Sequence, residues 1–393
     1  MVPNGWKRQP LEQVAEVRSG VAKGKTGLKD PVTVPYLRVA NVQDGYINLE
    51  DVKEIEIERD KLERFSLKKG DVLMNEGGDF DKLGRGDVWL GQIEPCLHQN
   101  HVFAVRPDQE LIDSFFLAAL AASHYGKTYF LSCAKRSTNL ASINSTQIKE
   151  FPVLVPPLPE QKKIAQIFST WDKAITTTEL LLTNSHQQKT ALMQQLFTCK
   201  KRLLDDNGVR FSGEWRERLL GYISKITTGR SNRQDSHMNG AYTFFDRSED
   251  IRTSDTYLFD CEAVIVPGEG QDFIPKYFVG KFDLHQRTYA IMDFPECHGK
   301  FLFYAINYFR SYFLSQAVGS TVKSLRLPMF EKMKIRLPTL EEQQKIAAIL
   351  STADQEITAL QQQLDHLKQE KKALMQQLLT GKRRVKIDDK EFV

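Results

Sequence analysis

The sequence predicts an α+β protein: two α/β domains in tandem, each followed by a long helix, with the two helices pairing as an antiparallel coiled coil with pseudo-two-fold symmetry. Three observations predict this fold: a helical stretch occurs twice, the segments before the two copies follow one plan, and each copy carries a heptad pattern. The predicted parts are a first domain (1–155), a first helix (156–203), a second domain (204–337), a second helix (338–385) and a tail (386–393).

The repeated helix is the strongest pattern in the chain. Ile164 aligns with Ile346, and the alignment continues without a gap to Arg202 and Arg384. About half of the paired positions are identical, including the block Ala-Leu-Met-Gln-Gln-Leu near the end of each copy. A repeat of this length indicates a duplicated structural unit.

Both copies step through apolar positions by four and three residues alternately, which is typical of a coiled coil. The seam of the first copy turns polar near its middle, at Thr178 and Ser185, so we expect a partner surface there. Lys189 and Lys371 occupy the same seam position, which suggests a site of partner attachment or register. The predicted seam consists of Ile164, Phe168, Trp171, Ile175, Thr178, Leu182, Ser185, Lys189, Leu192 and Leu196 with Ile346, Leu350, Ala353, Ile357, Leu360, Leu364, Leu367, Lys371, Leu374 and Leu378.

The ends of the helices carry stop and start signals. Thr339 is a candidate N-cap, and Glu342 would complete a capping box by reaching back to it. Gly381 and the basic clusters 200–202 and 382–384 suit helix C-termini. Because the second domain follows the first helix closely and directly precedes the second, helices that pair within the chain must run antiparallel. A coiled coil between two chains is the alternative.

The segments before the helices read as α/β domains. In the first we expect a short helix ended by Gly20, strands within 34–42 and 71–75 and at 88–93 and 98–105, a helix over 111–131 and a closing strand.

The second domain repeats this plan over a shorter stretch. Trp215 stands where Trp6 stood, and a shared Leu-His-Gln aligns His98 with His285. The two domains differ far more than the two helices, which suggests a constant frame that carries variable readers.

The amino-acid composition argues against several classes of protein. The chain has 393 residues, 41% hydrophobic and 26% charged, with a net charge of +4, which is compatible with a nucleic-acid partner but does not demand one. Five scattered cysteines without a C-x-x-C pair predict a reducing setting with no zinc cluster or disulfides. No stretch approaches the roughly 18 apolar residues of a membrane span, so we expect a soluble, cytoplasmic protein without a membrane partner.

The sequence contains no complete catalytic motif among those that it resembles. Gly20-Val-Ala-Lys-Gly-Lys-Thr26 has one residue too few for a phosphate-binding loop. The Pro156-Pro157 pair lacks the polar and aromatic neighbours of an amine methyltransferase motif. His98, His101 and His285 fit DNA contact or strand packing better than a metal site. We therefore expect no catalysis by this chain and no bound metal.

Loops rich in Lys, Arg, Asn, Ser and Thr recur at equivalent places in both domains. Such loops bring hydrogen-bond donors to phosphates and base edges, and their repetition in paired domains favours a nucleic-acid reader. The candidate DNA-binding residues are Lys23, Lys25, Thr26, Arg38, Asn41, Lys82, Arg85, His98, Gln99, Asn100, Arg136, Ser137, Thr138, Arg230, Asn232, Arg233, Arg247, Glu269, Lys276, His285, Gln286, Arg287, Ser320, Thr321 and Lys323.

The chain resembles the specificity subunits of Type I restriction-modification systems. The resemblance rests on the duplicated P-x-L-x-E-Q-x-x-I-A-x-I-x-S-x-x-D segment, Pro156 to Asp172 and Pro338 to Asp354, and on the paired helix ends. It implies two target recognition domains that each read one half of a bipartite, asymmetric DNA site, with the helices as a ruler for the spacer. It also implies two modification subunits docked along the helices and restriction subunits in the larger complex. S-adenosylmethionine, ATP and Mg would be bound by those partners and no cofactor by this chain.

Two rival functions remain at this point. A single-chain methyltransferase or nuclease would bind S-adenosylmethionine or modify DNA alone. A structural tether that uses its domains for protein partners would show no steep salt dependence of DNA binding.

Overall fold

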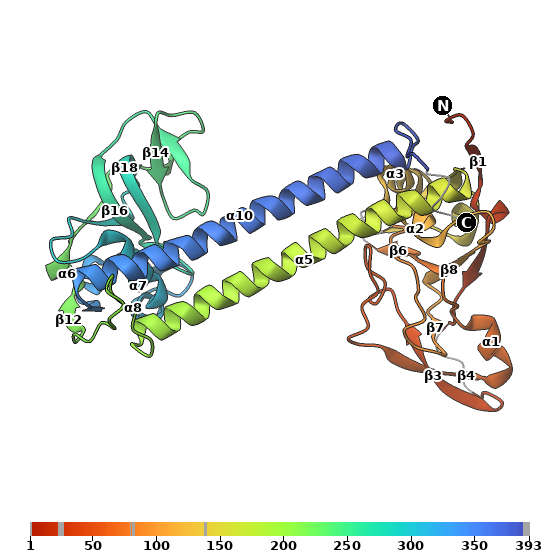
Figure 1. The fold of residues 1–393 in the computed structure, drawn as a ribbon, viewed down its shortest axis with the longest axis horizontal. Helices are drawn as coiled ribbons and strands as arrows, with labels where there is room; N and C mark the ends of the chain where they lie inside the picture. The colour runs from red at the N-terminus through yellow and green to blue at the C-terminus, as the bar shows by residue number, and fades with distance from the viewer. Residues whose placement is uncertain (1, 23–26, 79, 81–82, 137–139, 388–393) are drawn as a thin grey trace. The chain divides into compact units, whose positions relative to one another are not determined.

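The computed structural model describes residues 2–22, 27–78, 80, 83–136 and 140–387. The chain divides into two compact units, Met1–Thr178 with Gln363–Val393 and Glu179–Gln362. Each unit holds one globular domain and one half of each long helix (Figure 1). The expected α+β fold, two mixed domains with two long helices that pack together, is confirmed.

The first domain is built from short strands in several small sheets. Its strands pair in the orders β1-β11, β2-β8-β5, β4-β3-β7 and β6-β10-β9. The elements are β1 (Lys7–Pro10), η1 (Leu11–Gln13), β2 (Ala15–Ser19), β3 (Pro31–Leu37), β4 (Lys53–Glu58), η2 (Arg59–Lys61), α1 (Leu62–Phe65), β5 (Val72–Asn75), β6 (Gly77–Gly78), β7 (Leu97–His98), β8 (Val102–Pro107), α2 (Ser114–Ala122), α3 (His124–Cys133), β9 (Lys135–Arg136), β10 (Ala141–Ser142), α4 (Ser145–Lys149) and β11 (Pro152–Val155).

The second domain joins the equivalent strands into one sheet with the order β13-β19-β16-β18-β14-β15, beside the pairs β12-β21 and β17-β20. The long hairpin β16–β18 connects the two halves of this sheet. The elements are β12 (Arg216–Leu219), α6 (Leu220–Ile223), β13 (Lys225–Thr228), η3 (Arg233–Asp235), β14 (Tyr242–Phe245), β15 (Arg252–Ser254), β16 (Phe259–Pro267), β17 (Glu269–Gly270), β18 (Lys276–Leu284), β19 (Thr288–Met292), α7 (Gly299–Tyr308), α8 (Ser311–Gln316), β20 (Lys323–Ser324), α9 (Leu327–Glu331) and β21 (Lys334–Leu337).

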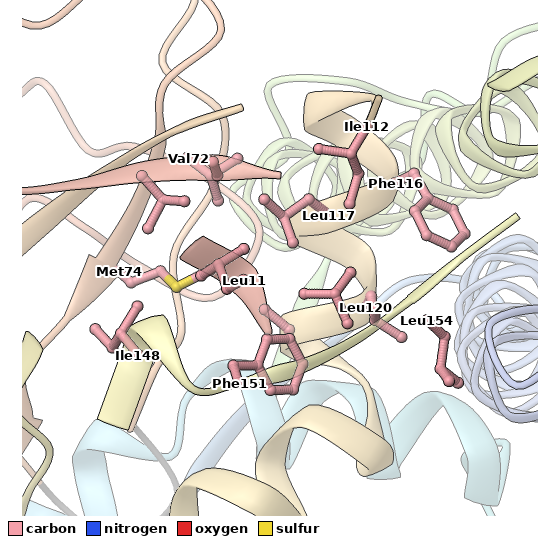
Figure 2. Close-up of a cluster of buried hydrophobic side chains, with 14 of the residues drawn as sticks. Leu11, Val72, Met74, Ile112, Phe116, Leu117, Leu120, Ile148, Phe151 and Leu154 are labelled. Atoms are coloured by element: carbon pink, nitrogen blue, oxygen red, sulfur yellow. The ribbon is translucent and has the colours of Figure 1, made fainter. Parts of the chain in front are cut away.

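The core of the first domain lies between α2, strands β5 and β11, and the start of the long helix α5 (Leu158–Phe197) (Figure 2). Leu11, Phe116, Leu120 and Phe151 are fully buried in it. The second domain has an equivalent core around Phe301 and Trp215, which also includes the start of the long helix α10 (Leu340–Leu378). In each unit the long helices are therefore part of the domain core, which fixes the domain to both helices.

Four sequence expectations in the first domain are wrong in detail. Residues 98–105 are not one strand but parts of β7 and β8, because Val102 donates its N–H to the Gln99 carbonyl and closes a turn between them. Residues 11–20 form the short η1 and then β2, because Ala15 to Ser19 pair with β8. Residues 88–93 form no strand, because pairing with β5 is limited to one isolated antiparallel bridge between Val88 and Val72. The expected helix over 111–131 is two helices, because Ser123 ends α2 and caps α3.

The long helices are α5 (Leu158–Phe197) and α10 (Leu340–Leu378), and they run antiparallel in each unit. Lys371 pairs with Asp172 in one unit, and Lys189 pairs with Asp354 in the other. These two pairs are equivalent under the repeat that aligns Ile164 with Ile346. Every predicted seam position is buried or half-buried, and Thr178, whose hydroxyl donates to the carbonyl of Ala174, is buried.

A second repeated contact closes the end of each helix pair. Arg202 forms two hydrogen bonds with Glu342, of 2.7 Å each, and a third with the Gly213 carbonyl. Arg384 contacts Glu160 in the same way and donates to the Asn4 carbonyl. Both glutamates are buried. We call these two contacts the latches.

The latches correct one expectation about helix capping. The Thr339 hydroxyl accepts from the Glu342 N–H at 3.4 Å, but the Glu342 carboxylate binds Arg202 instead of reaching back to the cap. At the other end, Gly381 adopts a φ of 66°, and a Cβ there would lie 2.3 Å from Pro3. Glycine at this stop therefore also makes room for the first residues of the chain. In the described part of the chain, no helix combines the length and apolarity needed to cross a membrane.

Candidate nucleic-acid interface

The candidate residues fall into distinct groups. Lys23, Lys25, Thr26, Lys82, Ser137 and Thr138 lie outside the described residues. Asn41 and His98 are buried, and Lys276 is tied to the carbonyls of Ser248 and Glu249. Gln99, Asn100, Asn232, Glu269, His285 and Lys323 are half-buried, as are Arg38 and Arg85. Arg136, Arg230, Arg233, Arg247, Gln286, Arg287, Ser320 and Thr321 are exposed.

Backbone hydrogen bonds give the true correspondence between the two domains. Gln99 donates its N–H to the carbonyl of Leu37, and His285 donates its own to that of Phe245, the residue that ends β14. The N–H of the next residue donates to the loop after the first strand of the equivalent sheet. This is Asn100 and the loop after β2 in the first domain, and Gln286 and the loop after β13 in the second. Gln99 therefore corresponds to His285.

The alignment of His98 with His285 is thus wrong by one residue. In extended chain a shift of one residue turns a side chain to the opposite face. His98 accordingly points into the domain, where its Nδ1 lies 2.6 Å from the Val102 carbonyl and burial lowers its pKa. His285 lies at the surface of the second domain. The histidines of the shared Leu-His-Gln tripeptide therefore lie in different environments.

The second domain gathers the candidates around one hollow. A cavity of about 290 Å³ is lined by Arg233, Asp246, Arg247, Glu269, His285, Gln286 and Arg287. Six of these seven residues were predicted from the sequence, and they come from four separate segments between β13 and β19. The hollow is therefore the place where the fold brings the predicted polar loops together.

Local backbone contacts fix the segments that form the hollow. Gly268 donates to the Arg287 carbonyl at 2.9 Å, and a Cβ on Gly268 would lie 2.5 Å from that oxygen. This close approach brings Glu269 beside Arg287. The turn at Arg287 is held in addition by its own N–H, which donates to Nδ1 of His285 at 3.1 Å.

The charges around the hollow are already paired. Glu269 contacts Arg287 directly and lies 3.6 Å from Arg247. Asp246 is buried, which alone would raise its pKa, but hydrogen bonds from Ser248 and the charge of Arg233 lower the pKa below its usual range. Burial lowers the pKa of His285. Because Nδ1 of this neutral ring accepts, its proton lies on Nε2, which is a donor.

The first domain carries different side chains at the equivalent positions. His101 corresponds to Arg287, since the carbonyl of each accepts from Glu76 or Gly268. His101 contacts Glu76, and Arg85 donates to Gln43 at 3.1 Å. Arg38 is held by Asp51 at 2.9 Å, and hydrogen bonds to Lys53 and Arg38 lower the pKa of that carboxyl. The shared frame therefore carries different polar side chains at equivalent positions of the two domains.

Sequence reasoning missed the carboxylates that orient these groups. The Asp246 carboxylate accepts from the Ser248 N–H, and that of Asp283 accepts from the Ser231 hydroxyl at 2.9 Å. Glu76 pairs with His101. The one feature of the sequence that could have indicated these carboxylates was their position, since each lies beside a predicted polar loop. Across the described ranges, which omit parts of three loops and both ends, no group of three or more His, Cys, Asp or Glu side chains could hold a metal ion.

Comparison with known proteins supports one family. The profile described as "Type I restriction modification DNA specificity domain" matches residues 3–184 and 212–369. A protein of Methanocaldococcus jannaschii assigned as the MjaX specificity subunit of a Type I restriction enzyme is 27% identical, and the alignment covers 98% of this chain and 95% of the relative. The EcoDI specificity subunit of Escherichia coli is 29% identical over 167 residues, 42% of this chain and 37% of the relative.

A solved structure agrees in fold. The crystal structure of a Type I restriction-modification S subunit from M. genitalium aligns over 96% of this chain and 97% of its own, with a TM-score of 0.64 and 14% identity. At this identity the likeness concerns the fold alone. The profile, however, matches both halves of the chain, each as one domain followed by part of a long helix. The chain therefore belongs to the specificity subunits of Type I restriction-modification systems, the family that recognises DNA sequence.

Proposed function

We propose that this chain is the DNA-reading subunit of its complex, in which each domain reads one half of a bipartite, asymmetric site. The observation that carries the proposal is one backbone frame, present twice, with different polar side chains at equivalent places. A palindromic site would need two identical readers, as in symmetric dimers. Two unlike readers on one chain suit two unlike half-sites.

The paired helices set the distance between the half-sites. Each unit anchors both helices in its domain core and through its latch, so the helices form a support that the chain keeps constant while the domains vary. The ion pairs Lys189–Asp354 and Lys371–Asp172 hold the register of the two helices. A fixed register is what a spacer of constant length requires.

Modification and restriction subunits are the proposed protein partners. Leu180 and Leu181 on α5 are 60% and 48% exposed, and they lie off the seam that joins the two helices. Exposed leucines on a long helix are suited to helix-on-helix docking by modification subunits. The buried Thr178 is less available for such contacts than these neighbours.

Catalysis belongs to the partners in this proposal. S-adenosylmethionine, ATP and Mg are bound by the modification and restriction subunits, and this chain supplies DNA recognition alone. The rival enzyme function predicts that the purified chain modifies DNA or binds S-adenosylmethionine by itself.

The direct test is a map of modified bases in DNA treated with this chain and its modification subunits. We expect two unlike short sequences separated by a spacer of constant length. Omission of the modification subunits should abolish modification, while sequence-dependent DNA binding by the complex should weaken steeply with salt. A palindromic or uninterrupted site, or modification by this chain alone, would contradict the proposal.

A further inference from the structure

We propose that Glu269 is a positioning residue that holds Arg247 and Arg287 for recognition of a guanine in the half-site of the second domain. The inference rests on the proposed function, because it names the base class and the residues of that same reader. Its starting point is the hollow of about 290 Å³ in which all three side chains meet.

The geometry gives the carboxylate and the arginines different roles. One oxygen of Glu269 contacts Nη1 of Arg287, and the other lies 3.6 Å from Nη1 of Arg247. The Glu269 side chain is 17% exposed, whereas those of Arg247 and Arg287 are 56% and 62% exposed. The carboxylate is therefore largely covered and engaged, and the guanidinium groups remain accessible to a ligand.

Electrostatics favours a base edge over a phosphate as that ligand. A carboxylate beside the arginines repels the full negative charge of a phosphate much more strongly than it repels the partial charges on the neutral edge of a base. Glu269 also uses one donor of Arg287 and leaves others free, since a guanidinium carries five. Arginines held in this way are suited to sequence reading.

The donors select among the bases. Guanine presents two acceptors, O6 and N7, in the major groove, and arginine binds both at once. Adenine places an amino group beside its N7, which faces guanidinium donors unfavourably. The neutral His285 adds a further donor at Nε2, so the hollow is rich in donors and its main acceptor is already occupied. Guanine fits this pattern best.

The first domain lacks this arrangement. By the backbone correspondence, Arg287 is replaced by His101, and Glu269, which pairs with β20 as Gly77 pairs with β10, is replaced by Gly77. The position after β14 that holds Arg247 corresponds to Val39 after β3. The two half-sites should therefore differ at the base that this surface contacts.

The test uses the complete complex of this chain with its modification subunits. Each guanine of the second-domain half-site is replaced in turn by 7-deazaguanine, which lacks the N7 acceptor, and DNA affinity is measured. At one guanine or at two, we expect the wild-type complex to lose roughly tenfold in affinity. In Arg287→Ala the natural site should already bind more weakly, and the same base replacement should cost little more.

The Glu269→Gln variant separates the positioning of the two arginines from the general effect of the Glu269 negative charge on DNA binding. The variant removes one negative charge, so binding to non-specific DNA should stay equal or tighten. Discrimination between guanine and 7-deazaguanine should nevertheless fall several-fold at the same position, because a neutral amide holds the arginines less firmly. Glu217→Gln is the matched control: Glu217 pairs with Lys334 at 2.8 Å on the separate β12–β21 sheet, and its loss should leave discrimination unchanged.

The possible failures are distinguishable. If the complex binds its site specifically but Glu269→Gln keeps full discrimination, or if no guanine in that half-site depends on N7, the inference is wrong and the proposed function stands. If exchange of the second domain leaves both half-sites unchanged, the proposed function itself fails. Thermal unfolding of each variant checks that its fold is intact, and Arg287→Lys provides a second variant should Arg287→Ala unfold.

Discussion

The two domains are alike where they meet the helices and unlike where they face solvent. Trp6 packs edge-on against Phe116 at 6.5 Å between ring centroids, and Trp215 packs in the same way against Phe301 at 6.0 Å. At the equivalent loop position, by contrast, the first domain has His101 where the second has Arg287. The difference teaches that this duplication has kept the residues that join domain to helix and has varied those that can touch a ligand.

The largest expected effect tests the shared part. Phe116→Ala and Phe301→Ala each remove a fully buried ring, so we expect each to lower the free energy of unfolding of its own unit by about 3–5 kcal/mol. Urea unfolding can be followed through Trp215 for the second unit and through the other tryptophans for the first. Very unequal losses would show that the two packing sites are not equivalent.

The latches come next. Glu160→Ala and Glu342→Ala each remove a buried carboxylate from an arginine, which should destabilise the unit by about 2–4 kcal/mol. Glu342→Ala leaves the more buried arginine unpaired, since Arg202 is 17% exposed and Arg384 is 43% exposed, whereas Glu160→Ala also leaves Nε1 of Trp6 without its acceptor. Urea unfolding should therefore show losses of similar size.

The latches also differ in a way that fluorescence can report. Nε1 of Trp6 donates to Glu160 at 3.1 Å, whereas Nε1 of Trp215 has no acceptor among the described residues. Glu160→Ala alone should therefore change the emission of a neighbouring tryptophan. A matching change of Trp215 emission in Glu342→Ala would contradict this distinction.

The two Lys–Asp pairs differ in the side chain that lies beside the aspartate, and this difference should have a smaller effect on the free energy of unfolding. Tyr304 donates to Asp354 at 2.6 Å, but Ala119 holds the equivalent place beside Asp172 and lines a hollow of about 960 Å³. Burial, with the hydrogen bond to Asp354 next, raises the pKa of Tyr304. Tyr304→Phe should destabilise the second unit by about 1 kcal/mol, and Ala119→Tyr should stabilise the first by a similar amount. Urea unfolding measures both, and a destabilising Ala119→Tyr would mean that the hollow cannot accept the ring.

The smallest expected effect concerns pH. Burial lowers the pKa of His98 below its ordinary 6.5, so the unfolded chain binds more protons than the folded one in that range. The stability that His98 contributes is complete above pH 6.5 and is lost as the pH falls through 6.5 towards the folded-state pKa. His98→Gln should flatten the stability of the first unit between pH 7 and 5. An unchanged slope would show that other groups cause it.

The repeated pattern made the fold predictable, while the register of the loops was not. Heptad spacing and the gapless alignment from Ile164 to Arg202 indicated the helix pair, because a coiled coil depends on local periodicity. The Leu-His-Gln match failed because a tripeptide does not determine which face a strand residue occupies. The latches were not predictable, because Glu160 and Arg384 lie far apart in sequence and each has the pattern of an ordinary charged residue at a helix end.

The candidate surface was predictable by residue type and not by geometry. Arg247, Glu269 and Arg287 were all chosen as polar loop residues, but only the folded chain brings them to one hollow. The roles within that hollow follow from burial, since Glu269 is covered and the arginines are exposed. No sequence pattern carries that information.

A chain that carries two copies of one domain tests whether each domain reads its own half-site. Residues 215–337 are replaced by residues 6–155. The ends correspond, because Val155 pairs with Lys7 as Leu337 pairs with Arg216, and Trp6 and Trp215 directly precede these strands. Modified bases are then mapped with the assembled complex. We expect the second half-site to become an inverted copy of the first, with a spacer of constant length. Retention of the original second half-site would contradict it.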